Sequence, residues 1–307
     1  MFCVLAISLV LSVACLSLTP SRPLSSRPAV SPTEKFQPTS TPPIAVENKP
    51  LITPNPELTS PVNWQDLPVI PSLSPEAIAI YQYGLTLGNN PRAFTKIGDG
   101  EISADWFLRI YDQDHEKYNL GIYSNLDKTI EYFSGSFSHR SQAAKRGFNT
   151  TRILDPKLAD RSVCLRGESP LDCEIRLYRP SFALISMGTN QIWQAEIFSQ
   201  ELRVILDTLI KKGVVPVLST KADNLEGDNR INIAITELAE EYHLPLWNFW
   251  KICQSLPNYG LQADLEHLTY INSYDFTDLR TMTYTWPNRN LSALQVLEML
   301  YLSLSPN

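Results

Sequence analysis

The sequence has no basic stripe interleaved with aromatic residues, which is the usual mark of a nucleic-acid surface. Its 26 lysine and arginine residues are outnumbered by 32 aspartate and glutamate residues, which gives a net charge of −6. A surface with that balance repels the phosphates of DNA and RNA. We therefore expect no nucleic-acid partner, and polyanionic partners in general are disfavoured.

Histidine and cysteine are also scarce, with four and five residues in a chain of 307. None of them has the spacing of a zinc site or of another metal site. The chain also has no internal repeat. We therefore expect neither a metal ion nor a cofactor.

The only strongly apolar stretch near the N-terminus is short. Residues 1–16 read MFCVLAISLVLSVACL, a run that is too short to cross a bilayer comfortably and that is typical of a secretory signal. Cys15 directly follows Ala14, as in bacterial lipoproteins whose new N-terminal cysteine is acylated. However, Ser12 replaces the usual leucine and no basic residue precedes the run, so a plain signal peptide or an uncleaved anchor stays open.

Proline, serine and threonine dominate residues 17–75. Fourteen of the 23 prolines fall between Pro20 and Pro75, and such a composition cannot bury enough apolar surface to fold. We predict a disordered tether there and one folded domain over residues 76–307. The chain is then extracytoplasmic, either secreted or anchored to the cell envelope, and contacts a membrane only through its N-terminal anchor or lipid.

Two cysteines lie close together in the segment CLRGESPLDC. Cys164 and Cys173 can close a short loop, and the expected oxidising compartment favours a disulfide between them. In the chain-entropy description such a bridge contributes about 2 to 3 kcal/mol. Cys253 has no evident partner and is expected to be a small buried apolar residue.

Strands and helices alternate through the second half of the chain. Phe182–Gly188 is a continuous apolar run of strand length, and the runs VVPVLST and LPLWNFW follow it. Segments with helical spacing separate these runs, and an earlier strand is expected at Phe94–Ile97. This order predicts right-handed crossovers, an α/β fold and a mostly parallel sheet with helices on both faces. In such sheets the chemistry lies beyond the C-terminal ends of the strands.

Short polar blocks follow the predicted strands. They read GDG at Gly98–Gly100, GTNQ at Gly188–Gln191, and a D-x-x-H pair formed by Asp264 and His267. In this order they resemble the G-D-S, G-x-N-D and D-x-x-H blocks of the SGNH (GDSL-like) hydrolases, and Gly147 matches the remaining glycine block. The resemblance covers roughly residues 90–300 and implies a three-layer fold whose mostly parallel sheet has five strands.

The resemblance also implies roles for these residues. In the family a serine attacks an ester, a histidine takes its proton and an aspartate orients the histidine; His267 and Asp264 match that pair. The oxyanion donors would be the backbone of Gly100, the backbone of Gly147 and the Asn190 amide. Gly100 stands at the nucleophile position and has no side chain to attack with.

Other assignments remain open. Ser103 lies one helical turn beyond Gly100 and should miss the required geometry by several ångströms. Gln191 stands where the family has aspartate, which should alter local hydrogen bonds more than catalysis. Asp99 can equally be a helix cap, Asn190 a turn residue and His267 an ordinary loop histidine.

Three functions fit these features. The first is an impaired or inactive relative that binds a carbohydrate or an acylated envelope glycan, with Trp193 and Trp286 as nearby aromatic residues. The second is an active esterase in which His267 and Asp264 activate water in the space left at Gly100. The third is a non-catalytic structural protein of the envelope. The oligomeric state is not evident from the sequence.

Overall fold

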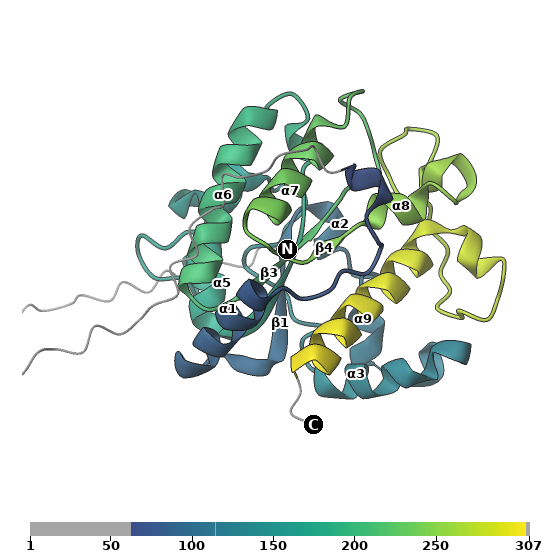
Figure 1. Ribbon diagram of the computed structural model, residues 1–307, viewed down its shortest axis with the longest axis horizontal. Helices are drawn as coiled ribbons and strands as arrows, with labels where there is room; N and C mark the ends of the chain where they lie inside the picture. The colour runs from purple at the N-terminus through teal and green to yellow at the C-terminus, as the bar shows by residue number, and fades with distance from the viewer. Residues whose placement is uncertain (1–62, 114, 305–307) are drawn as a thin grey trace, which may run out of the picture. The chain divides into compact units, whose positions relative to one another are not determined.

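Four parallel strands form the centre of the protein (Figure 1). The structure is a computed structural model that describes residues 63–113 and 115–304. The strands are β1 (Asn90–Gly98), β2 (Pro180–Ser186), β3 (Val215–Ser219) and β4 (Leu246–Trp247), in the order β1-β2-β3-β4. The predicted α/β fold with a parallel sheet is confirmed. The predicted signal segment, with Cys15, and most of the predicted tether lie outside the described residues.

The central strands are apolar along their whole length. Every residue of β2 and of β3 is buried. A strand covered on both faces needs apolar side chains pointing both ways, and the uninterrupted runs seen in the sequence supply them. Phe94 of β1 pairs with Phe182 of β2, which pairs in turn with Val215 of β3. Because the strands are parallel, their C-terminal ends meet at one edge.

The sheet has four strands among the described residues, so the prediction of five was wrong. The place beside β1, opposite β2, is taken by Ala144, which forms a single parallel bridge with Gly98. Two backbone hydrogen bonds of 3.0 and 3.1 Å join Gly98 to the residues on either side of Ala144. The chain then turns away at Gly147, which has a left-handed backbone (φ 79°), and the pairing cannot continue.

Helices cover both faces of the sheet. Their bounds are α1 (Pro75–Thr86), α2 (Gly100–Ser103), α3 (Asp127–Tyr132), α4 (Thr150–Leu154), α5 (Pro170–Tyr178), α6 (Ala195–Lys211), α7 (Arg230–Glu241), α8 (Phe249–Cys253) and α9 (Thr285–Leu304). Figure 1 shows α5, α6 and α7 on one side of the strands and α3 and α9 on the other. The three-layer arrangement therefore agrees with the sequence prediction.

Side chains of β1 and β2 show which helices belong to which layer. Phe182 stacks on Tyr81 of α1, with ring centroids 5.4 Å apart, and meets Phe133, the residue after α3, at 5.9 Å. On the opposite face, the Thr95 hydroxyl donates to Glu174 of α5 at 2.5 Å. The two faces of the sheet thus contact different helical layers, as the alternation of side chains along a strand requires.

The helix after Gly98 is short. The apolar residues Trp106 and Ile110 that follow it would suit a longer helix, but α2 ends at Ser103. Leu108 adopts a left-handed conformation (φ 63°), and its N–H donates to the Asn290 side chain of α9 at 2.6 Å. A contact between distant parts of the chain therefore overrides the local helical preference.

Residues 63–74, which we expected to belong to the tether, pack against the domain. Trp64 is buried, and its ring meets that of Trp250 at 4.7 Å. The Asn248 side chain donates to the carbonyls of Trp64 (2.9 Å) and Leu67 (3.2 Å), and the Asn248 N–H donates to Val69 (3.1 Å). Asn248 directly follows the edge strand β4, so these bonds hold residues 63–74 at the end of that strand. The packed part of the chain therefore begins before the predicted boundary at residue 76.

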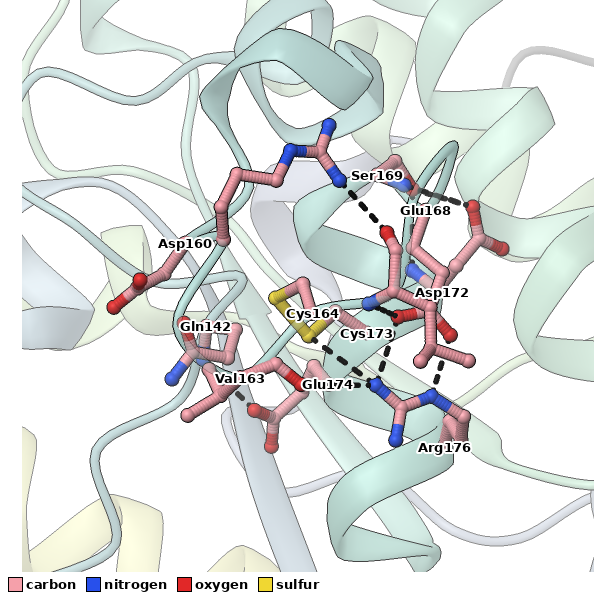
Figure 2. The surroundings of a disulfide bond; sticks show 12 residues. Gln142, Asp160, Val163, Cys164, Glu168, Ser169, Asp172, Cys173, Glu174 and Arg176 are labelled. Carbon is pink, nitrogen blue, oxygen red and sulfur yellow. Dashed lines mark hydrogen bonds and ion pairs between the residues drawn. A yellow bond between two sulfur atoms is a disulfide. The ribbon is translucent and has the colours of Figure 1, made fainter. Parts of the chain in front are cut away.

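The predicted disulfide is present and joins the loop before α5 to that helix (Figure 2). Cys164 and Cys173 have Cα atoms 5.3 Å apart. Arg176 supports the loop by donating to Glu168 at 2.5 and 2.8 Å and to the Val163 carbonyl at 3.2 Å.

Two further features concern the chain's environment. Cys253 is free and buried, as expected. Within residues 63–113 and 115–304, no helix has the length and hydropathy needed to cross a membrane.

Candidate functional site

Two of the blocks singled out in the sequence follow the C-terminal ends of strands. Asp99 comes directly after β1, and its N–H donates to the Ser186 carbonyl at the end of β2 at 3.3 Å. The block Gly188–Gln191 follows β2. A Cβ on Gly98 would lie 1.8 Å from the Ser186 carbonyl oxygen, so only glycine allows the two strand ends to approach this closely.

Asp264 and His267 form a hydrogen-bonded pair. His267 Nδ1 lies 2.8 Å from Asp264 Oδ2, while Asp264 Oδ1 accepts the backbone N–H groups of His267 (3.0 Å) and Glu266 (3.1 Å). These bonds to the ionised carboxylate, the backbone ones first, lower the pKa of Asp264 to about 2. The His267 side chain is 58% exposed. The imidazole is thus oriented by a carboxylate and accessible to a ligand.

Gly100 leaves open space at the start of α2. A Cβ placed on Gly100 would meet a single atom within 4 Å, Cγ of Arg146 at 3.7 Å, which is an ordinary contact. Its φ lies outside the left-handed region. A serine therefore fits at this position without displacing other atoms.

Gly147 and Asn190 lie near each other on neighbouring loops. The Asn190 side-chain amide donates to the carbonyl of Phe148, the residue after Gly147, at 3.1 Å. This bond uses one of the two amide hydrogens and leaves the other for a ligand. Gln191 supports the same junction, because its carbonyl oxygen accepts the N–H (2.9 Å) and the hydroxyl (2.8 Å) of Thr150 at the start of α4. Gln191 therefore has the local hydrogen-bonding role expected from the sequence.

Asp99 caps α2 and is almost fully buried. Its Oδ1 accepts the N–H of Glu101 at 3.1 Å, so the helix-cap interpretation of Asp99 holds. Burial, followed by the negative charge of Glu101, raises the pKa of Asp99 to about 7. A carboxyl group that titrates near neutrality is characteristic of functional sites, although buried ionic networks produce the same shift.

Glu101 belongs to the same region, and its side chain is 18% exposed. Its Oε2 lies 3.7 Å from Nη1 of Arg289, a fully buried residue of α9. Burial raises the pKa of Glu101, whereas the charges of Arg289, Lys221 and His267 act in the opposite direction.

Arg289 is surrounded by aromatic rings. The guanidinium carbon lies between 4.5 and 5.9 Å from the ring centroids of Phe107, Trp247, Phe249 and Trp286. Its Nη2 donates to the Ser186 hydroxyl at 2.7 Å. Its Nε and Nη1 have no hydrogen-bond partner among the described residues. Cation–π contacts and the nearby carboxylates together compensate part of the cost of burying this charge.

A second buried ionic group follows β3. Lys221 Nζ donates to Asp223 Oδ1 (2.6 Å) and to Glu226 Oε2 (2.7 Å), and all three side chains are buried. The Thr189 hydroxyl donates to Asp223 Oδ2 at 2.7 Å, which links this group to the loop after β2. The charge of Asp223 also raises the pKa values of Asp99 and Glu101, after the larger contributions of burial and nearer groups.

These charged residues were not identified from the sequence, apart from Asp99. We call the six side chains the buried charge cluster: Asp99, Glu101, Lys221, Asp223, Glu226 and Arg289. A signal was present, because Lys221 and Asp223 directly follow the apolar run of β3, just as Asp99 follows β1. Nothing in the sequence around Arg289 indicates that it is buried, since its burial depends on aromatic residues from three separate segments.

Of the two aromatic residues expected near the site, one is buried and the other is exposed. Trp286 is buried and therefore unavailable to a ligand, whereas Trp193 is 76% exposed. Trp106 is 43% exposed and packs against Tyr270 (5.4 Å) and Trp286 (5.7 Å). Tyr270 lies three residues after His267. Trp106 and Tyr270 thus form the accessible aromatic surface on the side of the histidine loop.

Neither of two surface cavities coincides with this region. One, of about 380 Å³, lies between residues 67–74 and α7, and the other, of about 420 Å³, lies beside α5. No group of three or more His, Cys, Asp or Glu side chains in the described parts of the chain is arranged to hold a metal ion.

The chain is similar to known proteins only at the level of solved structures. No model of a protein family matches the chain, and no curated protein matches it. Among solved structures, a GDSL-like lipase from Bacteroides thetaiotaomicron is similar, with a TM-score of 0.38 and 12% sequence identity; the match covers 72% of this chain and 98% of that one. A likeness this remote does not establish a shared function.

Proposed function

We propose that the domain is an SGNH-like, extracytoplasmic protein that binds an acylated carbohydrate of the cell envelope and lacks the nucleophile of a serine esterase. The proposal follows from the site itself, not from the remote structural likeness. Its ligand would lie over Gly100, between the histidine loop and the loops that carry Gly147 and Asn190.

The oriented pair of His267 and Asp264, whose Nδ1 and Oδ2 atoms lie 2.8 Å apart, carries the proposal. Gly100 leaves room for a further side chain. An imidazole held by a carboxylate is arranged to accept a proton from an attacking group. No such group stands at Gly100.

Two other residues could in principle attack an ester, and both are poorly suited. Ser103 is the last residue of α2, and its backbone is tied to the Asp99 carbonyl at 3.1 Å, one turn away from Gly100. Cys253 is buried, and this burial raises the pKa of its thiol far above the usual range, so it is not a thiolate at neutral pH.

The disulfide supports the location. A bridge between Cys164 and Cys173 forms and persists in oxidising compartments outside the cytoplasm. Export by the N-terminal signal, and acylation of Cys15, remain part of the proposal.

Hydrolysis of a short-chain aryl ester tests the proposal. We expect no turnover by the wild-type domain and measurable turnover by Gly100→Ser, because the new hydroxyl would stand beside an existing proton acceptor. Gly100→Ala is the matched control, since it adds the same Cβ without a hydroxyl and should stay inactive. The double variant Gly100→Ser/His267→Ala should lose the gained activity.

A second candidate function rests on the open space at Gly100. If a water molecule occupies it, His267 could activate that water directly, and the wild-type domain would hydrolyse the ester slowly. Activity that is present in the wild type and lost in His267→Ala would favour this function over the first. Inactivity of Gly100→Ser, together with the absence of a glycan-induced shift in melting temperature, would leave a structural role.

A further inference from the structure

One arginine lies beside Gly100 and another beside Gly147. A Cβ placed on Gly100 would lie 3.7 Å from Cγ of Arg146, so the stem of this side chain passes beside the open space. A Cβ placed on Gly147 would lie 3.9 Å from Nη1 of Arg152. Arg146 precedes Gly147, and Arg152 belongs to α4, which starts three residues after Gly147. We call Arg146 and Arg152 the rim arginines.

The rim arginines are exposed and unpaired. Within residues 63–113 and 115–304, neither guanidinium has a hydrogen-bond or ion-pair partner. Other arginines of the domain are paired with carboxylates, such as Arg176 with Glu168 and Arg230 with Asp228. Arg146 and Arg152 therefore leave two positive charges free for a ligand in a chain with a net charge of −6.

The surrounding groups favour a ligand at the rim. The Gly147 loop contributes the remaining Asn190 amide hydrogen, because that side chain already donates to the Phe148 carbonyl.

Negative charges lie below the rim. In the buried charge cluster, Asp99, Asp223 and Glu226 are buried, and Glu101 is 18% exposed. Arg289 and Lys221 lie among them, which offsets part of their charge. An anion would be repelled by the carboxylate of Glu101, and it is therefore expected at the exposed arginines.

We infer that Arg146 and Arg152 bind an anionic substituent of the glycan, a carboxylate or a phosphate, at the rim of the site. A planar guanidinium donates two parallel hydrogen bonds to either group, and such charge-assisted pairs give specificity as well as affinity. The inference rests on the proposed function and specifies it, since a neutral acylated sugar would leave both charges unused. The selectivity for acidic ligands then comes from Arg146 and Arg152, although the net charge of the whole chain is negative.

Calorimetric titration with a matched pair of oligosaccharides tests this inference. One is a galacturonic acid tetrasaccharide, and the other is the same chain after reduction of its carboxyl groups to alcohols. The solution contains 0.1 M salt, so that charges more than about 10 Å away are screened. We expect the wild-type domain to bind the acidic chain more tightly than the neutral one. Glucose 6-phosphate, compared with glucose, shows whether phosphate serves as well as carboxylate.

Variants of the rim arginines separate a local contact from general attraction. Arg146→Gln and Arg152→Gln should each weaken binding of the acidic chain about fivefold, the upper end for an exposed charge pair, and leave the neutral chain unaffected. Lys145→Gln removes the same charge from the adjacent residue and should change little. Equal wild-type affinity for both chains, no binding of the acidic chain, or an equal loss in Lys145→Gln would each overturn the inference.

A failure of this inference can be distinguished from a failure of the proposed function. Turnover gained by Gly100→Ser depends on His267 and does not require an anionic ligand. If that activity appears while the acidic chain shows no preference for the rim arginines, the site is SGNH-like and the inferred ligand charge is wrong. If the activity does not appear, a preference that depends on both rim arginines still establishes the anion site.

Discussion

Replacing Asp99 by asparagine should stabilise the domain at neutral and alkaline pH. Asp99 is buried and caps α2 by accepting the Glu101 N–H at 3.1 Å. Asparagine keeps the carbonyl oxygen in that position and preserves the cap. Unlike aspartate, asparagine cannot acquire a charge within the buried charge cluster.

The sign and size of the effect follow from the pKa of Asp99. It is raised from 3.8 to about 7 by burial and then by Glu101, so above pH 4 the unfolded chain loses this proton more readily than the folded one. The stability of the wild type therefore falls as pH rises from about 4 to about 7 and then levels off. Each pH unit in this range lowers the free energy of unfolding by about 1.4 kcal/mol, so the total loss is about 4 kcal/mol.

Urea denaturation at several pH values measures this effect. Between pH 5 and pH 8 the stability of Asp99→Asn relative to the wild type should rise by about 3 kcal/mol, or about 1 M in urea midpoint for a slope near 3 kcal/mol per M. Asp155→Asn is the matched control, because Asp155 also caps a short helix by accepting the N–H two residues on, but it is only partly buried. A stability difference between Asp99→Asn and the wild type that does not change with pH would refute the reasoning.

Two further predictions concern the stability of the domain. Replacing both Cys164 and Cys173 by serine removes the bridge across the loop before α5 and should lower the free energy of unfolding by about 2 to 3 kcal/mol; the same stability with and without a reducing agent would contradict this. Trp64→Ala should cost about 3 to 5 kcal/mol, because the ring is buried against Trp250. Trp193→Ala, in which the lost ring is 76% exposed, should change the melting temperature little.

Local chemistry accounts for what could be predicted from the sequence. The strands β2 and β3 are buried on both faces and therefore appear as uninterrupted apolar runs. The start of α1 was predictable because Ser74 caps the helix through the Ala77 N–H and Pro75 occupies the first turn. Asp264 and His267 are three residues apart, so their hydrogen bond needs only one turn of chain.

The tertiary structure decided everything that depends on segments far apart in the chain. The buried charge cluster gathers residues that follow β1 and β3 with Arg289 of α9, and nothing in their separate neighbourhoods indicates that they meet. The same holds for Trp64, whose burial depends on Trp250, and for the left-handed Leu108 held by Asn290. Sequence patterns record short-range periodicity and cannot record which distant surfaces come into contact.

The composition of the site shows this division most clearly. From the sequence alone, Gly100 is predicted to stand at a nucleophile position, and Asp264 with His267 is predicted to form a pair for proton transfer. That Arg146 lies beside Gly100, that Glu101 faces Arg289 and that Trp286 is buried depended on how the loops pack at the C-terminal edge of the sheet. Side-chain identity is a property of the sequence, whereas burial and charge environment arise only when the chain is folded.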